Sequence, residues 1–146
     1  QIVTETVDLL NIKPVGDSSI GIVGSTRYTF SYDNPINNAF VKTFQAEYKE
    51  VPDTWDGEQW QACQFLEAAI RKAKSTETGA LIKSLEGMEL QTVKGRVVMR
   101  ACDHQAEQQG FVVRVGKRDG FSHPVPEVLK TYPANRVTPG CRLDSY

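Results

Sequence analysis

The sequence has few of the features that mark specialised classes of protein. It contains three cysteines and two histidines in 146 residues, and no two cysteines have the C-x2-C spacing typical of a zinc site, so we expect no structural metal. The longest apolar runs are only a few residues, far short of the roughly 20 that cross a bilayer as a helix. No block of five like charges occurs, and 17 basic against 18 acidic residues give a net charge of -1. This balance argues against nucleic acid as a partner.

Motifs for nucleotide binding and nucleophilic catalysis are also missing. Gly21 and Gly24 lack a third glycine and a following helix, so neither the dinucleotide nor the P-loop pattern is met. The G-x-S-x-G motif of serine hydrolases is absent. Asp103 and His104 invite a general-base interpretation, but neighbours in sequence rarely orient each other in that way. A structural turn is the simpler interpretation of this pair.

The composition that is present fits one globular domain. Apolar residues make up 40% and charged residues 24%, which excludes a disordered tail for most of the length. A chain of this length fits one domain and leaves no room for two full ones. It opens on Gln1, without Met and without the regions of a signal peptide. We therefore expect the chain to have lost its natural start.

The clearest local signal is a helix start at Asn34 and Pro35. An asparagine can accept a backbone N–H as the N-cap, and a proline in the first turn loses no hydrogen bond. Apolar residues at helical spacing then continue to Lys49.

Two further helices follow. Apolar spacing predicts one over residues 60–74 and a shorter one over residues 78–86, with Leu81, Ile82 and Leu85 inward and Gly87 as its C-terminal cap. The acidic residues before the second helix suit its N-cap and its dipole. A calcium site is the alternative, but the D-x-D-x-D-G order of a calcium loop is missing. These acidic residues are Asp53, Asp56 and Glu58.

Strands are expected at both ends of the chain. Residues 20–23, 93–99 and 111–115 are rich in β-branched and apolar side chains. Residues 125–129 and Val137 are weaker candidates, because nearby prolines restrict them to sheet edges. The sequence therefore predicts an α/β fold with central helices.

Aromatic residues alternate with small polar ones after Thr26. In an extended segment, Tyr28, Phe30 and Tyr32 would all lie on one face. The segment could form a second strand or a crossing between domains. Periodicity alone favours a core position for these rings and for Trp60.

Three stretches of the chain, taken in order, resemble a known family. They are YDNPINNAF at residues 32–40, WQACQ at 60–64 followed by AAI at 68–70, and GRV with MRACDHQ at 95–105. They resemble the C-terminal part of periplasmic solute-binding proteins of the branched-chain amino acid type, the receptors of ABC importers. The match runs from about Gly21 to Cys141. Because members are much longer, the chain resembles only the last portion of one.

The resemblance implies part of a two-lobe fold that closes on a solute. Residues 1–32 would belong to the second lobe, and residues 33–109, with three helices and a strand, to the first. Residues 110–146 would return to the second lobe as its C-terminal strands and tail.

The implied function is capture of an amino acid or a related small polar or aromatic solute in the periplasm and its delivery to an inner-membrane ABC permease. Such a receptor is not an enzyme and needs no cofactor. Trp60 stands where the family commonly has a cleft tyrosine, so we expect it to line the solute site with Tyr28 and Phe30. Leucine-binding members have a glutamate where this chain has Ile20, which argues against a plain aliphatic amino acid, because a ligand ammonium would lose its partner.

The periplasmic location also permits a disulfide. We expect it between Cys102 and Cys141, since the Pro- and Gly-flanked tail needs an anchor, and we expect Cys63 to be a buried thiol on an apolar helix stripe. The isolated chain is expected to associate through apolar faces that the missing segments would cover.

Two other functions remain open from the residues themselves. One is a small enzyme domain that uses Asp103, His104 and a cysteine. The other is a stand-alone interaction domain.

Overall fold

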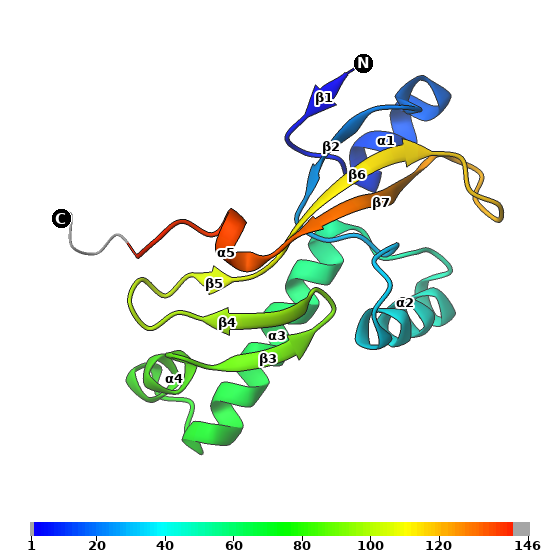
Figure 1. The fold of residues 1–146 in the computed structure, drawn as a ribbon. Coiled ribbons are helices and arrows are strands. Elements are labelled where there is room, and N and C mark those ends of the chain that lie inside the picture. Colours follow the sequence, from blue (N-terminus) through cyan, green and yellow to red (C-terminus); the bar gives the residue numbers. More distant parts are fainter. Residues whose placement is uncertain (1, 142–146) are drawn as a thin grey trace.

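The computed structural model describes residues 2–141. Gln1 and residues 142–146 lie outside the described residues, and both belong to segments that we expect in the second lobe. The helices are α1 (Leu9–Val15), the 3-10 turn η1 (Gly16–Ser19), α2 (Pro35–Tyr48), α3 (Thr54–Ala73), α4 (Thr78–Leu85) and α5 (Ala134–Val137). The strands are β1 (Val3–Thr4), β2 (Val23–Thr26), β3 (Glu89–Thr92), β4 (Gly95–Met99), β5 (Ala106–Glu107), β6 (Gly110–Gly116) and β7 (Val125–Tyr132). The fold is α/β, as the sequence predicted (Figure 1).

Strands from the two ends of the chain form one sheet, called sheet A here, in the order β1-β2-β6-β7. β1 and β2 run parallel, while β6 pairs antiparallel with both β2 and β7. Helix α1 lies beside this sheet (Figure 1), where Val7 and Ile12 pack against Phe111, Val113 and Val115 of β6. Sheet A and α1 therefore share one apolar core.

The middle of the chain forms a second sheet, called sheet B, in the antiparallel order β3-β4-β5. Helix α3 runs along it (Figure 1) and buries Phe65 and Ala69 against Met88 and Val97. This core is separate from the core of sheet A, so α3 is fixed to sheet B.

The chain passes between the two sheets at residues 27–34, at residues 108–109 and after β7. Helix α5 follows β7 (Figure 1). Val137 of α5 packs at Gly110, where an added Cβ would lie 3.0 Å from its side chain. After α5 the chain is tied to sheet B, because Cys141 is bonded to Cys102 in the loop between β4 and β5.

The three alternating rings of the first connection do not share a face. Residues 27–34 form no strand, so side chains there do not alternate as in a strand. Tyr28 packs with Phe40, Phe30 with Leu9, and Tyr32 with Phe111. The expectation of one aromatic face is wrong, because irregular backbone sends each ring into a different apolar cluster.

The first predicted helix is confirmed in detail. The Asn34 side chain accepts hydrogen bonds from the backbone N–H groups of Ile36 and Asn37, at 2.9 and 3.1 Å, and Pro35 is the first helical residue. The helix ends at Tyr48, and Lys49 adopts the left-handed conformation.

The other two helices differ from expectation at particular residues. α3 begins at Thr54, six residues before Trp60, because Asp53 is its N-cap and the backbone N–H of Asp53 donates to the Asp56 carboxylate at 2.8 Å. In α4, Ile82 is 44% exposed, so its predicted inward position is wrong. Gly87 follows this helix with φ +70°, as expected of a C-terminal cap.

Two predicted strands start later than expected, and one predicted strand is a helix. Strand β2 covers Val23–Thr26, and Ile20 is an exposed residue of the turn before it. Residues 93–99 are not one strand, because Val93 and Lys94 form the turn between β3 and β4. Val137 belongs to α5. The edge position predicted for residues 125–129 is confirmed, since β7 is the last strand of sheet A.

A buried ion pair joins α3 to the β3–β4 turn. The Lys94 ammonium is fully buried and is bonded to the Glu58 carboxylate, which is 25% exposed. Burial lowers the pKa of Lys94, and the charge of Glu58 partly offsets this effect. Gln109, in the second connection, donates to the Lys94 carbonyl oxygen at 2.8 Å. The turn thus anchors both the helix and a connection between the sheets.

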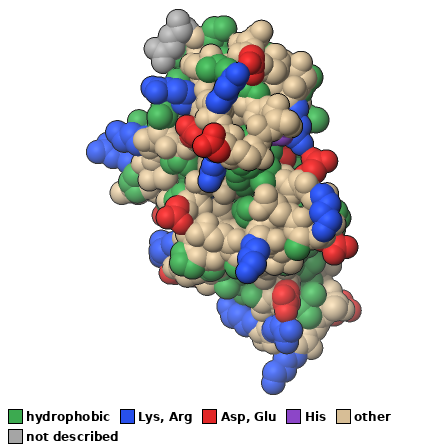
Figure 2. All heavy atoms as spheres, turned by 90° about the vertical axis from the view of Figure 1, so that its right-hand side faces the viewer, with side chains coloured by type: hydrophobic (Ala, Val, Ile, Leu, Met, Phe, Trp, Pro, Cys, Tyr) green, Lys and Arg blue, Asp and Glu red, His purple; other side chains and the backbone are tan. Residues whose placement is uncertain are grey.

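On the face that Figure 2 shows, side chains of both charge signs are interspersed with hydrophobic ones. Within residues 2–141, none of the helices combines the length and apolar character that a bilayer crossing requires.

Candidate functional site

A polar pocket of about 420 Å³ lies where sheet A meets the beginning of α3. Parallel strands β1 and β2 end at the same edge of sheet A, and the residues after them enter the pocket. In open α/β sheets, ligands characteristically bind outside the carboxyl ends of the strands. The lining residues are Glu5, Thr6, Asp8, Ser25, Thr26, Arg27, Thr54 and Trp55.

Arg27 and Trp55 give this pocket a cation and an aromatic surface. The Arg27 guanidinium lies 5.6 Å from the centre of the Trp55 ring, which is within the range of a cation–π contact. Trp55 is 59% exposed, and among the described residues no carboxylate forms an ion pair with Arg27. The guanidinium is therefore available to a bound carboxylate.

The pocket floor is a network of hydroxyl groups. The Thr26 hydroxyl lies 3.1 Å from the Thr54 hydroxyl and donates to the Tyr28 carbonyl oxygen at 2.8 Å. Because Thr26 ends β2 and Thr54 begins α3, these bonds fix the sheet edge against the helix. Glu5, which is exposed, supplies a carboxylate at the rim.

The N-terminus of α1, beside the pocket, is already occupied by protein groups. Asp53 accepts hydrogen bonds from the N–H groups of Leu9 and Leu10, each at 2.9 Å. Asp8 accepts from the N–H of Asn11, also at 2.9 Å. An anionic solute would therefore meet Arg27 and not the free N–H groups of a helix.

Trp60 lies in a different depression. A groove of about 740 Å³ separates α2 from α3, and the 45% exposed Trp60 ring stacks on Phe40 there, with ring centres 4.9 Å apart. Trp60 is in the second turn of α3, so its expected place at the helix start is wrong. The groove is lined by Pro35, Ile36, Ala39, Phe40, Thr43, Phe44, Glu47, Tyr48, Asp56, Gln59, Trp60, Cys63 and Gln64.

The two expected neighbours of Trp60 are interior residues. Tyr28 is 1% exposed, its hydroxyl donates to Asn37 Oδ1 at 2.8 Å, and burial raises its pKa. Gly57 leaves room for this ring, since a Cβ there would lie 2.3 Å from a ring atom. Phe30 is 8% exposed and packs with Leu9 in another cluster. The structure brings Tyr28 near Trp60 through Phe40 but leaves Phe30 apart, and a binding role for the three stays a prediction.

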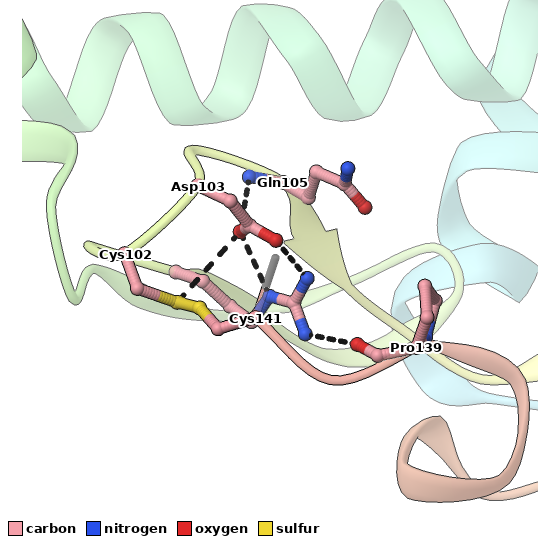
Figure 3. The surroundings of a disulfide bond; sticks show 6 residues. Cys102, Asp103, Gln105, Pro139 and Cys141 are labelled. Atoms are coloured by element: carbon pink, nitrogen blue, oxygen red, sulfur yellow. Dashed lines mark hydrogen bonds and ion pairs between the residues drawn. A yellow bond between two sulfur atoms is a disulfide. The ribbon is translucent and has the colours of Figure 1, made fainter. Parts of the chain in front are cut away.

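The expected disulfide is present. Cys102 and Cys141 are bonded, with their Cα atoms 6.2 Å apart, and the bond ties the chain after α5 to the β4–β5 loop (Figure 3). Arg100 reinforces the tie, because it pairs with Asp103 and donates to the Pro139 carbonyl oxygen. Cys63 is exposed, so its prediction as a buried thiol is wrong: it lies on the open groove side of α3.

The other candidate groups do not assemble into a catalytic or metal site. The Asp103 carboxylate is bonded to Arg100, and His104 Nε2 lies 3.1 Å from Glu86 instead. The Asp103 carboxylate also lies near both bonded sulfur atoms, but a disulfide leaves neither sulfur as a thiolate ligand.

The three acidic residues considered for calcium also have separate partners. Asp53 accepts from α1, Asp56 accepts from Asp53, and Glu58 pairs with Lys94.

Sequence reasoning missed the pocket residues Glu5, Arg27 and Trp55. Only Trp55 could have been noticed in the sequence, because it is an aromatic residue next to the acidic N-cap of a predicted helix. Ile20, taken as the position of a ligand-binding glutamate, is not in the pocket, and Glu5 supplies a carboxylate there instead.

Comparisons with known proteins agree on one family. The model of the family described as periplasmic binding protein matches residues 1–120, while no curated protein matches the chain. An ABC-type branched-chain amino acid transporter structure from Rhodopseudomonas palustris is 30% identical, with a TM-score of 0.80 over 92% of this chain and 36% of that one.

Two further structures, both 19% identical, share the fold. One is a leucine-, isoleucine-, valine-, threonine- and alanine-binding protein from Brucella ovis, with a TM-score of 0.83 over 99% of this chain and 39% of that one. The other is an ABC transporter solute-binding protein from R. palustris in complex with p-hydroxybenzoic acid, with a TM-score of 0.81 over 92% of this chain and 37% of that one. The chain thus spans little more than a third of the structures that it matches. Since the family model covers most of its length, the chain belongs to the periplasmic binding protein family.

Proposed function

We propose that this chain is the C-terminal part of the solute-binding receptor of an ABC importer. The receptor captures a small polar or aromatic solute in the periplasm and delivers it to a permease in the inner membrane. It binds the solute without changing it and needs no cofactor. Family membership and the likeness to ABC solute-binding structures support this proposal.

The two sheets correspond to parts of two lobes under this proposal. Sheet A with α1 is built from residues 3–26 and from the strands β6 and β7 after residue 109, and sheet B with α3 and α4 is built from residues 54–107. Separate apolar cores and three connections between the sheets support the division.

The assignment of the solute site rests on one observation. The polar pocket is lined by residues of both units of the fold, sheet A with α1 and sheet B with α3. Glu5 and Arg27 follow strands of sheet A, while Trp55 lies in the first turn of α3, the helix of sheet B. A site between lobes needs groups from both walls, and a volume of about 420 Å³ suits a small molecule.

The chemistry of these side chains selects the solute class. A guanidinium binds a carboxylate with two parallel hydrogen bonds, an indole provides an apolar face, and the Glu5 carboxylate can accept from an ammonium or a hydroxyl group. Amino acids and hydroxylated aromatic acids fit this set. Two of the similar structures have such ligands in their descriptions, amino acids for the Brucella ovis protein and p-hydroxybenzoic acid for the R. palustris protein.

Calorimetric titration of the full-length receptor with amino acids and aromatic acids tests the proposal. Arg27→Ala and Trp55→Ala should each raise the Kd of the best solute more than tenfold, which corresponds to about 1.4 kcal/mol. Trp60→Ala is the matched control, because it removes an indole from the same helix outside the pocket, and it should leave the Kd unchanged.

The opposite result would place the solute site elsewhere on the molecule. If Trp60→Ala abolishes binding and Trp55→Ala does not, the solute lies in the groove between α2 and α3, as the sequence first suggested. Normal binding by Arg27→Ala would refute the polar pocket as the solute site.

A further inference from the structure

We propose that Asp53 is a positioning residue that clamps the two walls of the polar pocket together. This inference rests on the proposed function, in which that pocket binds the solute. Asp53 does not line the pocket itself, so it would act through the residues on either side of it.

The geometry of the Asp53 carboxylate is that of a clamp. Its Oδ1 accepts from the Leu9 N–H and its Oδ2 from the Leu10 N–H, both at 2.9 Å. Asp53 is 44 positions from Leu9 and 43 from Leu10 in sequence. Both carboxylate oxygens of Asp53, the N-cap of α3, are thus bonded to the first turn of α1.

The two helices belong to different units of the fold. α1 shares the apolar core of sheet A, and α3 shares the apolar core of sheet B. Leu9 also packs against Val51, just before Asp53, within a cluster that includes Val125. The carboxylate therefore lies at a contact between the two units, next to their apolar junction.

Electrostatics favours a carboxylate at this place. The positive ends of two helix dipoles, those of α1 and α3, meet at Asp53, and each stabilises a negative charge. Hydrogen bonds to an ionised acceptor are also stronger than those between neutral groups. The two N–H donors of α1 need a carboxylate, which has two acceptor oxygens. A neutral amide has one acceptor oxygen, and its NH2 group would face the second N–H donor.

The clamp is connected directly to the pocket walls. Trp55 follows Asp53 by two residues in the first turn of α3, and Glu5 lies in the segment that leads into α1. Releasing α1 from Asp53 would let these side chains separate. The fraction of receptor with a formed pocket would then fall, and the apparent Kd would rise by the same factor.

Asp53→Asn is the test variant, because asparagine remains a good N-cap for α3 and removes one of the two bonds to α1. Asp56→Asn is the matched control. It weakens the same helix end through the bond from the Asp53 N–H but does not touch α1. Leu10→Pro removes the N–H donor from the opposite side, at an exposed residue in a first turn that tolerates proline.

Two measurements on the full-length receptor give the expected results. Hydrogen exchange of the Leu10 amide, without solute, should be at least tenfold faster in Asp53→Asn and unchanged in Asp56→Asn. The Kd of the best solute should rise at least tenfold in Asp53→Asn and in Leu10→Pro, and the double variant should bind no worse than either single variant, because both weaken the same contact between Asp53 and α1.

The outcomes separate this inference from the proposed function. Faster exchange at Leu10 with an unchanged Kd would overturn the positioning role, since Asp53 would then only stabilise α1. Unchanged exchange in Asp53→Asn would overturn the clamp. Normal binding by Arg27→Ala would instead refute the pocket and leave the exchange result as it is.

Discussion

The buried pair of Lys94 and Glu58 gives the sharpest stability prediction. The Lys94 side chain has no exposed surface, and Glu58 is 25% exposed. Removing one partner of a buried pair leaves an unpaired charge and typically costs about 3–5 kcal/mol. Because part of Glu58 reaches solvent, we expect Glu58→Gln to lower the free energy of unfolding by about 3 kcal/mol, at the lower end of that range.

A double-mutant cycle distinguishes the pair from its individual side chains. Replacing both members, with Glu58→Gln and Lys94→Met, removes the unpaired charge and should cost about 1 kcal/mol or less. Glu67→Gln is the matched control on the same helix, because its partner Arg71 is 77% exposed. Exposed pairs are worth about 0.2–1 kcal/mol.

The pH dependence supplies a second check. Burial lowers the pKa of Lys94 below its unfolded value of 10.5, and loss of Glu58 would lower this pKa further. Between the two values the unfolded chain binds more protons than the folded one, so stability rises with pH. The cost of Glu58→Gln should therefore shrink as the pH approaches 10.5. Urea unfolding of the full-length receptor measures it, and a cost at pH 7 no larger than that of Glu67→Gln would refute the reasoning.

Three further predictions follow from other parts of the structure. Cys102→Ser with Cys141→Ser should lower the free energy of unfolding by about 4 kcal/mol in the chain-entropy model, given their sequence separation of 39. Cys63→Ser should have no such effect, and peptide mapping that finds both bridging thiols free would contradict this prediction. Tyr28 should stay protonated when exposed tyrosines ionise, because burial raises its pKa; Tyr28→Phe should then leave the alkaline absorbance titration of the folded protein unchanged and reduce only that of the unfolded chain. The isolated chain should self-associate through the groove between α2 and α3; Trp60→Glu should shift its sedimentation toward monomer, and a wild-type chain that is monomeric at high concentration would exclude this.

Local sequence determined the elements whose signals are complete within a few residues. Asn34 and Pro35 start a helix because one side chain supplies the cap and the other lacks only an N–H that would be unpaired in any case. Pro126 limits its strand to a sheet edge, where β7 lies. The order of short motifs was also enough to indicate the family. The periplasmic location that the resemblance implies, together with a Pro- and Gly-flanked tail that needs an anchor, suggested the pairing of Cys102 with Cys141.

Only the tertiary structure reveals the polar pocket that we propose as the solute site. Glu5, Arg27 and Trp55 are far apart in sequence, and they meet because parallel pairing of β1 and β2 brings two strand ends to the start of α3. Periodicity identifies which side of an element is apolar, but it does not say which other element covers that side. For this reason the sequence favoured Trp60, on a regular apolar stripe, while the indole beside the Arg27 guanidinium in the polar pocket is that of Trp55.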